Sequence, residues 1–272
     1  YSLAKVYNPD FKYWQGVECA FYAAFYRVAT LGSGAGVAAI YYFNERGVPY
    51  SKGTGLYTIE YMLHKVSIAL FAGIFFILNW GYMQKYYSQY DMTLLIGFGV
   101  TFVIAAVLLL FACSKKFHEV LLWIVRKLNR SGKLTEQVKK LEEQCAILED
   151  AAATLLKRGG LIAGCILKNL LKFTFWYGIP FLILAETGKL TLSQGLAVTS
   201  LAMMLAAVIP APAGIGSSEF VLTMLLAKIV GTGAAGSVAL LYRFATFVLP
   251  FVIGAVVVVL WRRVHRSTEK AA

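Results

Sequence analysis

Residues 209–219 read Ile-Pro-Ala-Pro-Ala-Gly-Ile-Gly-Ser-Ser-Glu and lie between two apolar runs, 195–209 and 217–230. Two prolines and two glycines in this short stretch interrupt any helix that enters it. Each flanking run is shorter than the roughly 20 residues that a helix needs to cross a bilayer core. The stretch therefore predicts two short helices joined by a break, which form a re-entrant hairpin.

The composition supports a membrane setting for this hairpin. Apolar residues make up 59% of the 272 residues, and charged residues only 15%. Soluble domains carry about 25% charged residues, and disordered chains carry low hydrophobicity with high charge. Both classes are disfavoured, and we predict an all-α polytopic membrane protein with an inverted repeat and two re-entrant broken-helix hairpins. The chain opens at Tyr1 rather than Met, so we leave open that further spans precede it.

Four segments are predicted to be full membrane spans: 54–79, 93–113, 161–185 and 237–261. The loop 114–158 carries ten Lys and Arg residues and the tail after Trp261 carries four, whereas 80–92 and 186–194 carry one each. The positive-inside rule places the loop and the tail in the cytoplasm. The chain then divides into an N-terminal membrane half, 1–113, a cytoplasmic amphipathic helical loop, 114–158, and a C-terminal membrane half, 159–272.

This topology makes 190–236 begin and end on the outer side. A second hairpin, entered from the inner side, is predicted where the runs 14–30 and 37–43 flank the glycine-rich residues 32–36. We expect the two breaks to be formed by Gly32, Gly34, Gly36, Pro210, Pro212, Gly214 and Gly216. In each half a glycine-bearing turn (53–55 and 231–233) then leads into a long span that carries a charge, Glu60 or Arg243.

Inverted repeats with broken helices are typical of secondary transporters, whose sites lie where the breaks meet. The alternative is that the glycines and prolines only allow helices to pack closely.

Ionisable groups inside apolar segments are costly and usually face a cavity or a partner. The candidate substrate-binding residues are Arg27, Glu60, Lys168, Lys172, Glu219 and Arg243. Arginine suits phosphate. Glu219, an acid at a helix N-terminus, either caps the helix, contacts a cationic head group or pairs with Arg243. Glu60 and His64 share a helical face, as do Lys168 and Lys172. Snorkelling to the interface is the alternative for Arg27.

The loop 114–158 contains two helical patterns. Apolar residues at three- and four-residue spacing over 117–128, with basic neighbours, predict an amphipathic helix. Residues 134–155 keep a 4-3 apolar spacing over three heptads. The two helices either pack on each other or offer 134–155 as a docking surface for a synthase partner.

Three stretches carry a family resemblance. Residues 209–219, the segment Leu-Leu-Tyr-Arg-Phe-Ala-Thr-Phe-Val-Leu-Pro at 240–250, and Arg-Val-Ala-Thr-Leu-Gly-Ser-Gly-Ala-Gly at 27–36 resemble the lysylphosphatidylglycerol synthase transmembrane-region family. This family includes the flippase half of the multiple peptide resistance factor and stand-alone flippase-like proteins. The resemblance implies a bacterial plasma-membrane protein, linked to antimicrobial peptide resistance, that moves an aminoacylated phospholipid between leaflets. Ala211 and Ala213 depart from the family's usual motif, which leaves the substrate open.

The sequence thus favours a phospholipid translocase whose partners are membrane lipids. The alternatives are the membrane part or partner of a lysyltransferase that makes lysylphosphatidylglycerol, or a membrane scaffold. No HExxH, GxSxG or Walker motif occurs in the sequence, and the separate cytosolic domain that makes the lipid in two-part relatives has no counterpart in it. We expect no metal, no cofactor and no nucleic-acid partner, and a homo-oligomer remains compatible with the sequence.

Overall fold

The computed structural model of the chain describes residues 1–88, 99–100, 102–104, 106–107, 110, 114–128, 135–209 and 211–271, with the backbone alone for 264–271. Every regular element in these residues is helical. Most of the predicted span 93–113, and Pro210 in the second break, lie outside the described residues.

The N-terminal half contains a helical hairpin followed by a long helix. A short turn, η1 (Ala4–Val6), precedes α1 (Tyr13–Ala29) and α2 (Gly34–Glu45), and α3 (Tyr50–Leu78) leads into α4 (Trp80–Tyr87). The turn predicted at 53–55 is wrong, because α3 starts directly after Pro49 and runs through it. The glycine at 55 serves packing instead: a Cβ there would lie 2.5 Å from the Ala151 side chain of the neighbouring helix α7 (Thr135–Leu155).

The C-terminal half repeats this order after one further helix. It consists of α8 (Gly159–Leu184), η3 (Ala185–Thr187), α9 (Leu192–Ala206), η4 (Pro212–Gly214), α10 (Ser217–Val230), α11 (Thr232–Arg243), η5 (Phe244–Val248) and α12 (Leu249–Ala271). Here the predicted glycine turn is present, since Gly231 has φ +84° between α10 and α11. The segment η5 is a widened π-helical turn. Pro250 follows it and lacks the N–H that a regular helix would use there.

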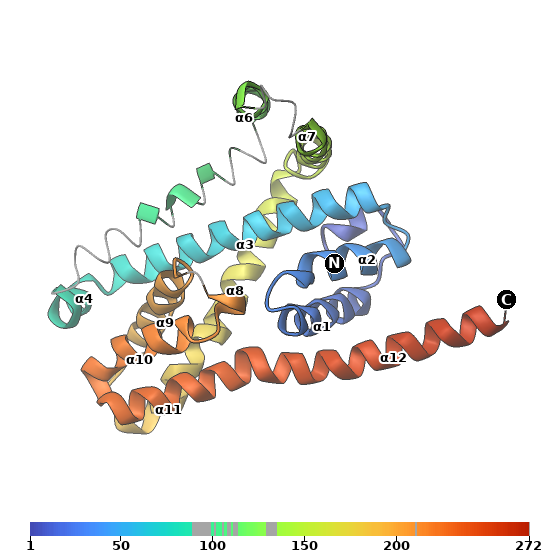
Figure 1. The fold of residues 1–272 in the computed structure, drawn as a ribbon. Coiled ribbons are helices and arrows are strands. Elements are labelled where there is room, and N and C mark those ends of the chain that lie inside the picture. The colour runs from blue at the N-terminus through green and yellow to red at the C-terminus, as the bar shows by residue number, and fades with distance from the viewer. Residues whose placement is uncertain are drawn as a thin grey trace.

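The two halves pack reciprocally. Figure 1 shows α3 and α12 as the long helices on opposite sides of the molecule, with α1–α2 between them at one end and α9–α10 between α3 and α11 at the other. The long helix of each half contacts the first hairpin helix of the other half: α3 packs on α9, and α12 packs on α1. Each hairpin has its own apolar core.

Three of the described helical segments are long and apolar enough to cross a membrane: Tyr50–Leu78, Pro212–Val230 and Thr232–Arg263. The first and third contain most of the predicted spans 54–79 and 237–261. The second joins η4 to α10 across Ala213, Gly214 and Gly216, which all have positive φ, so its regular helix is α10, which coincides with the apolar run 217–230. The predicted span 161–185 corresponds to α8, which is helical throughout but is not one of the three.

Two further helices, α6 (Lys115–Leu128) and α7 (Thr135–Leu155), form where the loop patterns predict them. They pack on each other through polar contacts: an ion pair joins Arg126 to Glu142 at 2.6 Å, and a hydrogen bond joins His118 Nδ1 to Glu149 Oε1 at 3.1 Å. The other side of α7 packs on α3, where Lys52 binds Asp150. The apolar stripe of α7 is therefore largely used inside this molecule.

We expect Gly254→Ala to destabilise the contact between α1 and α12. A Cβ at Gly254 would clash with the carbonyl oxygen of Phe21, so the helices must separate. Overpacking of this kind costs about 1–3 kcal/mol. The thermal midpoint of the detergent-purified protein, followed by size-exclusion chromatography, should fall. Gly73→Ala is the matched control, because nothing lies within 4 Å of its new methyl group. A midpoint for Gly254→Ala at or above that of the wild type would contradict this packing.

The α6–α7 contact should weaken in acid. Hydrogen bonding from His118, with Lys115 nearby, lowers the pKa of Glu149 below its ordinary value of 4.5. A carboxyl group whose pKa is lowered by folding contributes its full stability above pH 4.5, where it is ionised in both the folded and the unfolded protein. This contribution is lost as the pH falls through the pKa that the group has in the folded protein. Hydrogen exchange in α6, corrected for intrinsic rates, should rise between about pH 6 and about pH 3.5. In Glu149→Gln the rise should be smaller, whereas the exposed Glu143→Gln should behave like the wild type.

Candidate functional site: the junction of the two interrupted hairpins

The first interruption is the turn 30–33 between α1 and α2. Leu31 and Gly32 have φ of +53° and +107°, which turns the chain back on itself. The Thr30 hydroxyl donates to the carbonyl oxygen of Tyr26 at 2.6 Å and accepts from the N–H of Gly34 at 2.6 Å. Gly34 and Gly36, predicted as break residues, lie in the first turn of α2. The Tyr57 ring occupies the place of a Cβ on Gly36, so this glycine lets α3 approach closely.

The second interruption follows α9 and ends at Gly216. Pro212 begins the short turn η4, and Ala213, Gly214 and Gly216 all have positive φ, between +54° and +85°. Glu219 then reaches back from the first turn of α10, where its Oε2 accepts from the N–H of Gly216 at 3.0 Å. This is the capping role expected for an acid at a helix start.

The two interruptions touch each other. A Cβ built on Gly32 would lie 3.3 Å from the backbone nitrogen of Ala213. The tips of the two hairpins, far apart in the sequence, therefore meet backbone to backbone. Irregular backbone at membrane depth is tolerated where it is buried in protein or lines a wet cavity.

Arg243 closes the second interruption from the end of α11. Its Nε lies 3.1 Å from Glu219 Oε1, and its Nη2 donates to the carbonyl oxygen of Ala213 at 3.1 Å. The guanidinium also lies 3.7 Å from the centroid of the Phe247 ring, in the π-helical turn. Both side chains of the ion pair remain partly open, with exposures of 17% for Arg243 and 22% for Glu219. Glu219 therefore both caps α10 and pairs with Arg243.

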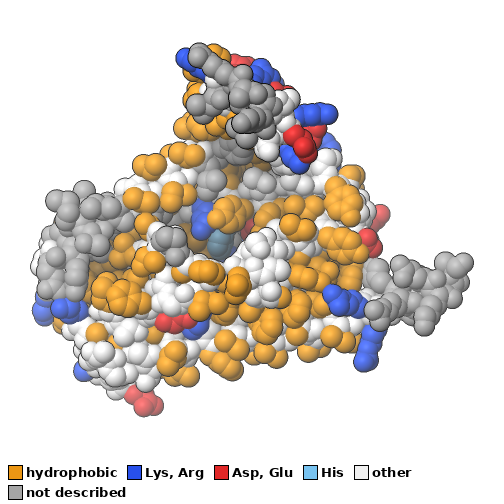
Figure 2. Space-filling view, viewed as in Figure 1, with side chains coloured by type: hydrophobic (Ala, Val, Ile, Leu, Met, Phe, Trp, Pro, Cys, Tyr) orange, Lys and Arg blue, Asp and Glu red, His pale blue; other side chains and the backbone are white. Residues whose placement is uncertain are grey.

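A second polar group joins α3 to α8. Lys172 Nζ lies 3.0 Å from His64 Nδ1 and donates to Asn169 Oδ1 at 3.0 Å. Glu60 lies one turn before His64 on α3, is exposed, and is within Coulombic range of Lys172 and Arg27. Figure 2 shows a hollow on the face in view, with Lys or Arg and His side chains at its bottom.

Arg27 influences both groups electrostatically without touching either. It is exposed, its charge acts on Glu60 and on Arg243, and its side chain has no hydrogen-bond or ion-pair partner in the described part of the chain. Lys168 is separate from this set, since its Nζ donates to Ser2 Oγ at 2.6 Å. The junction thus gathers three cations (Arg27, Lys172, Arg243) and two acids (Glu60, Glu219).

The chemistry of this set suits a zwitterionic or anionic headgroup. Guanidinium groups bind phosphate oxygens in a forked geometry, and carboxylates bind ammonium groups. Among the described residues no group of three or more His, Cys, Asp or Glu could hold a metal ion.

Asn169 and Phe247 are the contacts that the sequence analysis missed. The sequence contains a weak signal for Asn169: it lies three residues before Lys172, a spacing that places both side chains on one face of α8.

We expect Glu219→Gln to relieve part of the damage that Arg243→Gln causes. Removal of the guanidinium leaves Glu219 Oε1 without its cation and the Ala213 carbonyl without its side-chain donor, which costs on the order of 1–3 kcal/mol. A double-mutant cycle on the thermal midpoint should show coupling between the two positions. Additive effects of the two substitutions would contradict the ion pair.

Comparison with known proteins places this geometry in a family. The model for the lysylphosphatidylglycerol synthase TM region matches residues 3–254, which include both hairpins and Arg243. No curated protein and no solved structure matches the chain. With nearly the whole chain matched, this membrane protein belongs to the lysylphosphatidylglycerol synthase TM region family.

Proposed function

We propose that the protein is a phospholipid translocase and that the lipid headgroup crosses the membrane at the hairpin junction. The observation that carries this proposal is the contact between the two interruptions, Gly32 against Ala213, with charged side chains gathered around it. A polar headgroup has a high barrier to crossing an apolar core. Open backbone and charged side chains at the junction lower that barrier, while the acyl chains stay in the surrounding lipid.

The substrate that fits best is an aminoacylated phosphatidylglycerol. Its phosphate would bind Arg27 and Arg243, and its amino groups would bind Glu219 and Glu60. Because Arg243 and Glu219 bind each other at 3.1 Å in the structure, a headgroup that carries both charges can replace each partner with an equivalent one. A lipid with only a phosphate would leave the Glu219 carboxylate unpaired, which is costly.

The reciprocal packing suggests how access could alternate. Each hairpin is held between the long helices of both halves, α3 with α9 and α12 with α1. We propose that the halves form an inverted repeat and that both hairpins are re-entrant from opposite sides. Rocking of one hairpin against the other would then expose the junction first to one leaflet and then to the other. The cytoplasmic position of 114–158 and of the C-terminal tail is part of this proposal.

The translocase can be tested in proteoliposomes of phosphatidylcholine and phosphatidylglycerol. Lysylphosphatidylglycerol is placed in one leaflet, and its arrival in the other leaflet is measured with an impermeant amine reagent. Arg243→Gln and Lys172→Gln should each slow transfer about tenfold or more, the cost of one lost charged hydrogen bond. Lys189→Gln is the matched control, because it removes an exposed charge far from the junction in sequence. Equal rates in all variants, or no transfer by the wild type, would refute the proposal.

The family description favours one other candidate, a membrane part or partner of a lysyltransferase that makes lysylphosphatidylglycerol. The same purified protein, incubated with lysyl-tRNA and phosphatidylglycerol, tests it directly. New lysylphosphatidylglycerol from this chain alone would favour the enzyme. Product that forms only with an added synthase, and is lost when 134–155 is deleted, would favour a partner role for α7.

A further inference from the structure

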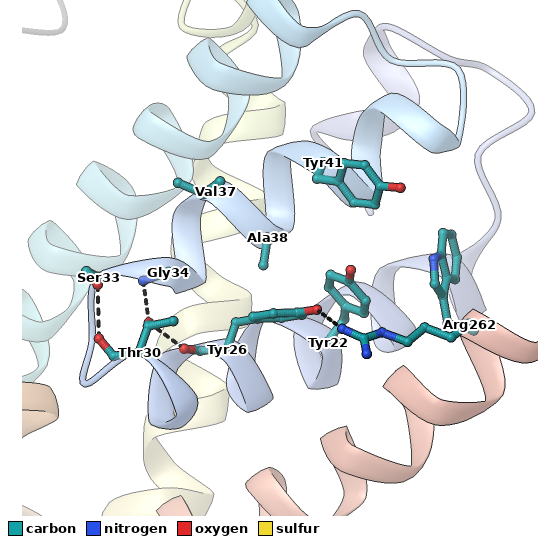
Figure 3. Close-up of a pocket in the computed structure, with 10 residues that line it drawn as sticks. Tyr22, Tyr26, Thr30, Ser33, Gly34, Val37, Ala38, Tyr41 and Arg262 are labelled. Carbon is teal, nitrogen blue, oxygen red and sulfur yellow. Dashed lines mark hydrogen bonds between the residues drawn. The ribbon is translucent and has the colours of Figure 1, made fainter. Parts of the chain in front are cut away.

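A groove separate from the charged junction lies between α1, α2 and the middle of α12, where Trp261 and Arg262 line it. Its volume is about 830 Å³, within the range of about 300–1,000 Å³ typical of small-ligand sites. Figure 3 shows Tyr22, Tyr26, Val37, Tyr41 and Arg262 along it. One wall is therefore aromatic and apolar, and the end formed by α12 carries a positive charge.

Arg262 is the group in this groove that lacks a counter-charge. Its Nη2 donates to the Tyr26 hydroxyl at a long 3.3 Å, and no carboxylate lies within ion-pair distance among the side chains that the structure describes. The neighbouring Arg46 differs, because it pairs with Glu18 at 3.2 Å and lies over the Trp261 ring at 4.6 Å. The guanidinium of Arg262 thus keeps free N–H donors for an anion.

The other end of the groove reaches the first interruption. Thr30, Ser33 and Gly34 line it there (Figure 3). The adjacent Gly32 contacts Ala213, whose carbonyl binds Arg243. The groove therefore runs from the middle of α12 to the tip of the first hairpin, where the charged junction begins. Val37, 71% exposed, leaves its apolar wall open along α2.

We propose that this groove is a phospholipid-binding site, with the lipid phosphate on Arg262 and the upper part of an acyl chain along Val37 and Tyr41. A soluble anion would satisfy Arg262 but gain nothing from the aromatic wall, whereas a phospholipid uses both. The site's place on a path to the junction rests on the proposed function; the binding itself does not. In that path the groove holds the lipid before or after its headgroup passes the two interruptions.

Binding is tested by native mass spectrometry of the full-length protein, titrated with phosphatidylglycerol in detergent. Arg262→Gln should weaken binding of one phosphatidylglycerol molecule about tenfold, the effect of one charged hydrogen bond. Val37→Trp should reduce the same binding by filling the groove without a change of charge. The matched controls are Arg263→Gln, which removes an adjacent charge outside the groove, and Leu240→Trp, which enlarges an exposed apolar residue on α11. Both should bind like the wild type.

The outcomes separate this site from the translocase. Loss of phosphatidylglycerol binding in Arg262→Gln and Val37→Trp, but not in the two controls, supports the groove. If the wild type also moved no lipid in proteoliposomes, that second result would refute only the path to the junction. Equal binding in all five proteins overturns the site. An equal loss of phosphatidylglycerol binding in Arg262→Gln and Arg263→Gln would mean that surface charge in general attracts the lipid, and this result would also overturn the site. Binding of glycerol 3-phosphate as tight as that of phosphatidylglycerol would overturn the role of the apolar wall.

Discussion

A break in a helix leaves backbone N–H and C=O groups that must find partners, and in an apolar setting the chain itself must supply them. The second interruption depends on the pair Arg243 and Glu219. Arg243 binds the carbonyl of Ala213, Glu219 accepts from the N–H of Gly216, and the two side chains bind each other at 3.1 Å. At the first interruption, the Thr30 hydroxyl serves the N–H of Gly34. Polar side chains are therefore required at this junction for the fold as well as for any ligand.

The close contact of the two tips follows from small residues. Gly32 and Ala213 bring backbone against backbone, as Gly254 does between α12 and α1. Because each long helix packs on the hairpin of the other half, a movement of one hairpin changes contacts in both halves. The proposed alternating access needs such coupling, since in that proposal the junction opens to one leaflet while it closes to the other.

The charges around the junction are unevenly satisfied. Arg243 and Glu219 neutralise each other, and Lys172 is held by His64 and Asn169, whereas Arg27 has no ion-pair partner in the described part of the chain. An incoming phosphate would find Arg27 available before the other cations. Arg262, at the far end of the groove, is likewise without a carboxylate among the described side chains. In the proposed path, these two arginines would receive the lipid phosphate in succession.

The sequence by itself determined the helical class, the family and the places of both interruptions, because prolines, glycines and apolar runs act locally on the backbone. It also placed a charge in each half, Glu60 and Arg243, and named Glu219 as one partner for Arg243, a pair that the structure contains. Only the tertiary structure decided that Lys168 and Lys172, four residues apart, bind different partners, that residues 53–55 continue a helix, and that Gly32 meets Ala213. These outcomes depend on which helices pack together, and contacts between distant segments leave no periodic signal in the sequence.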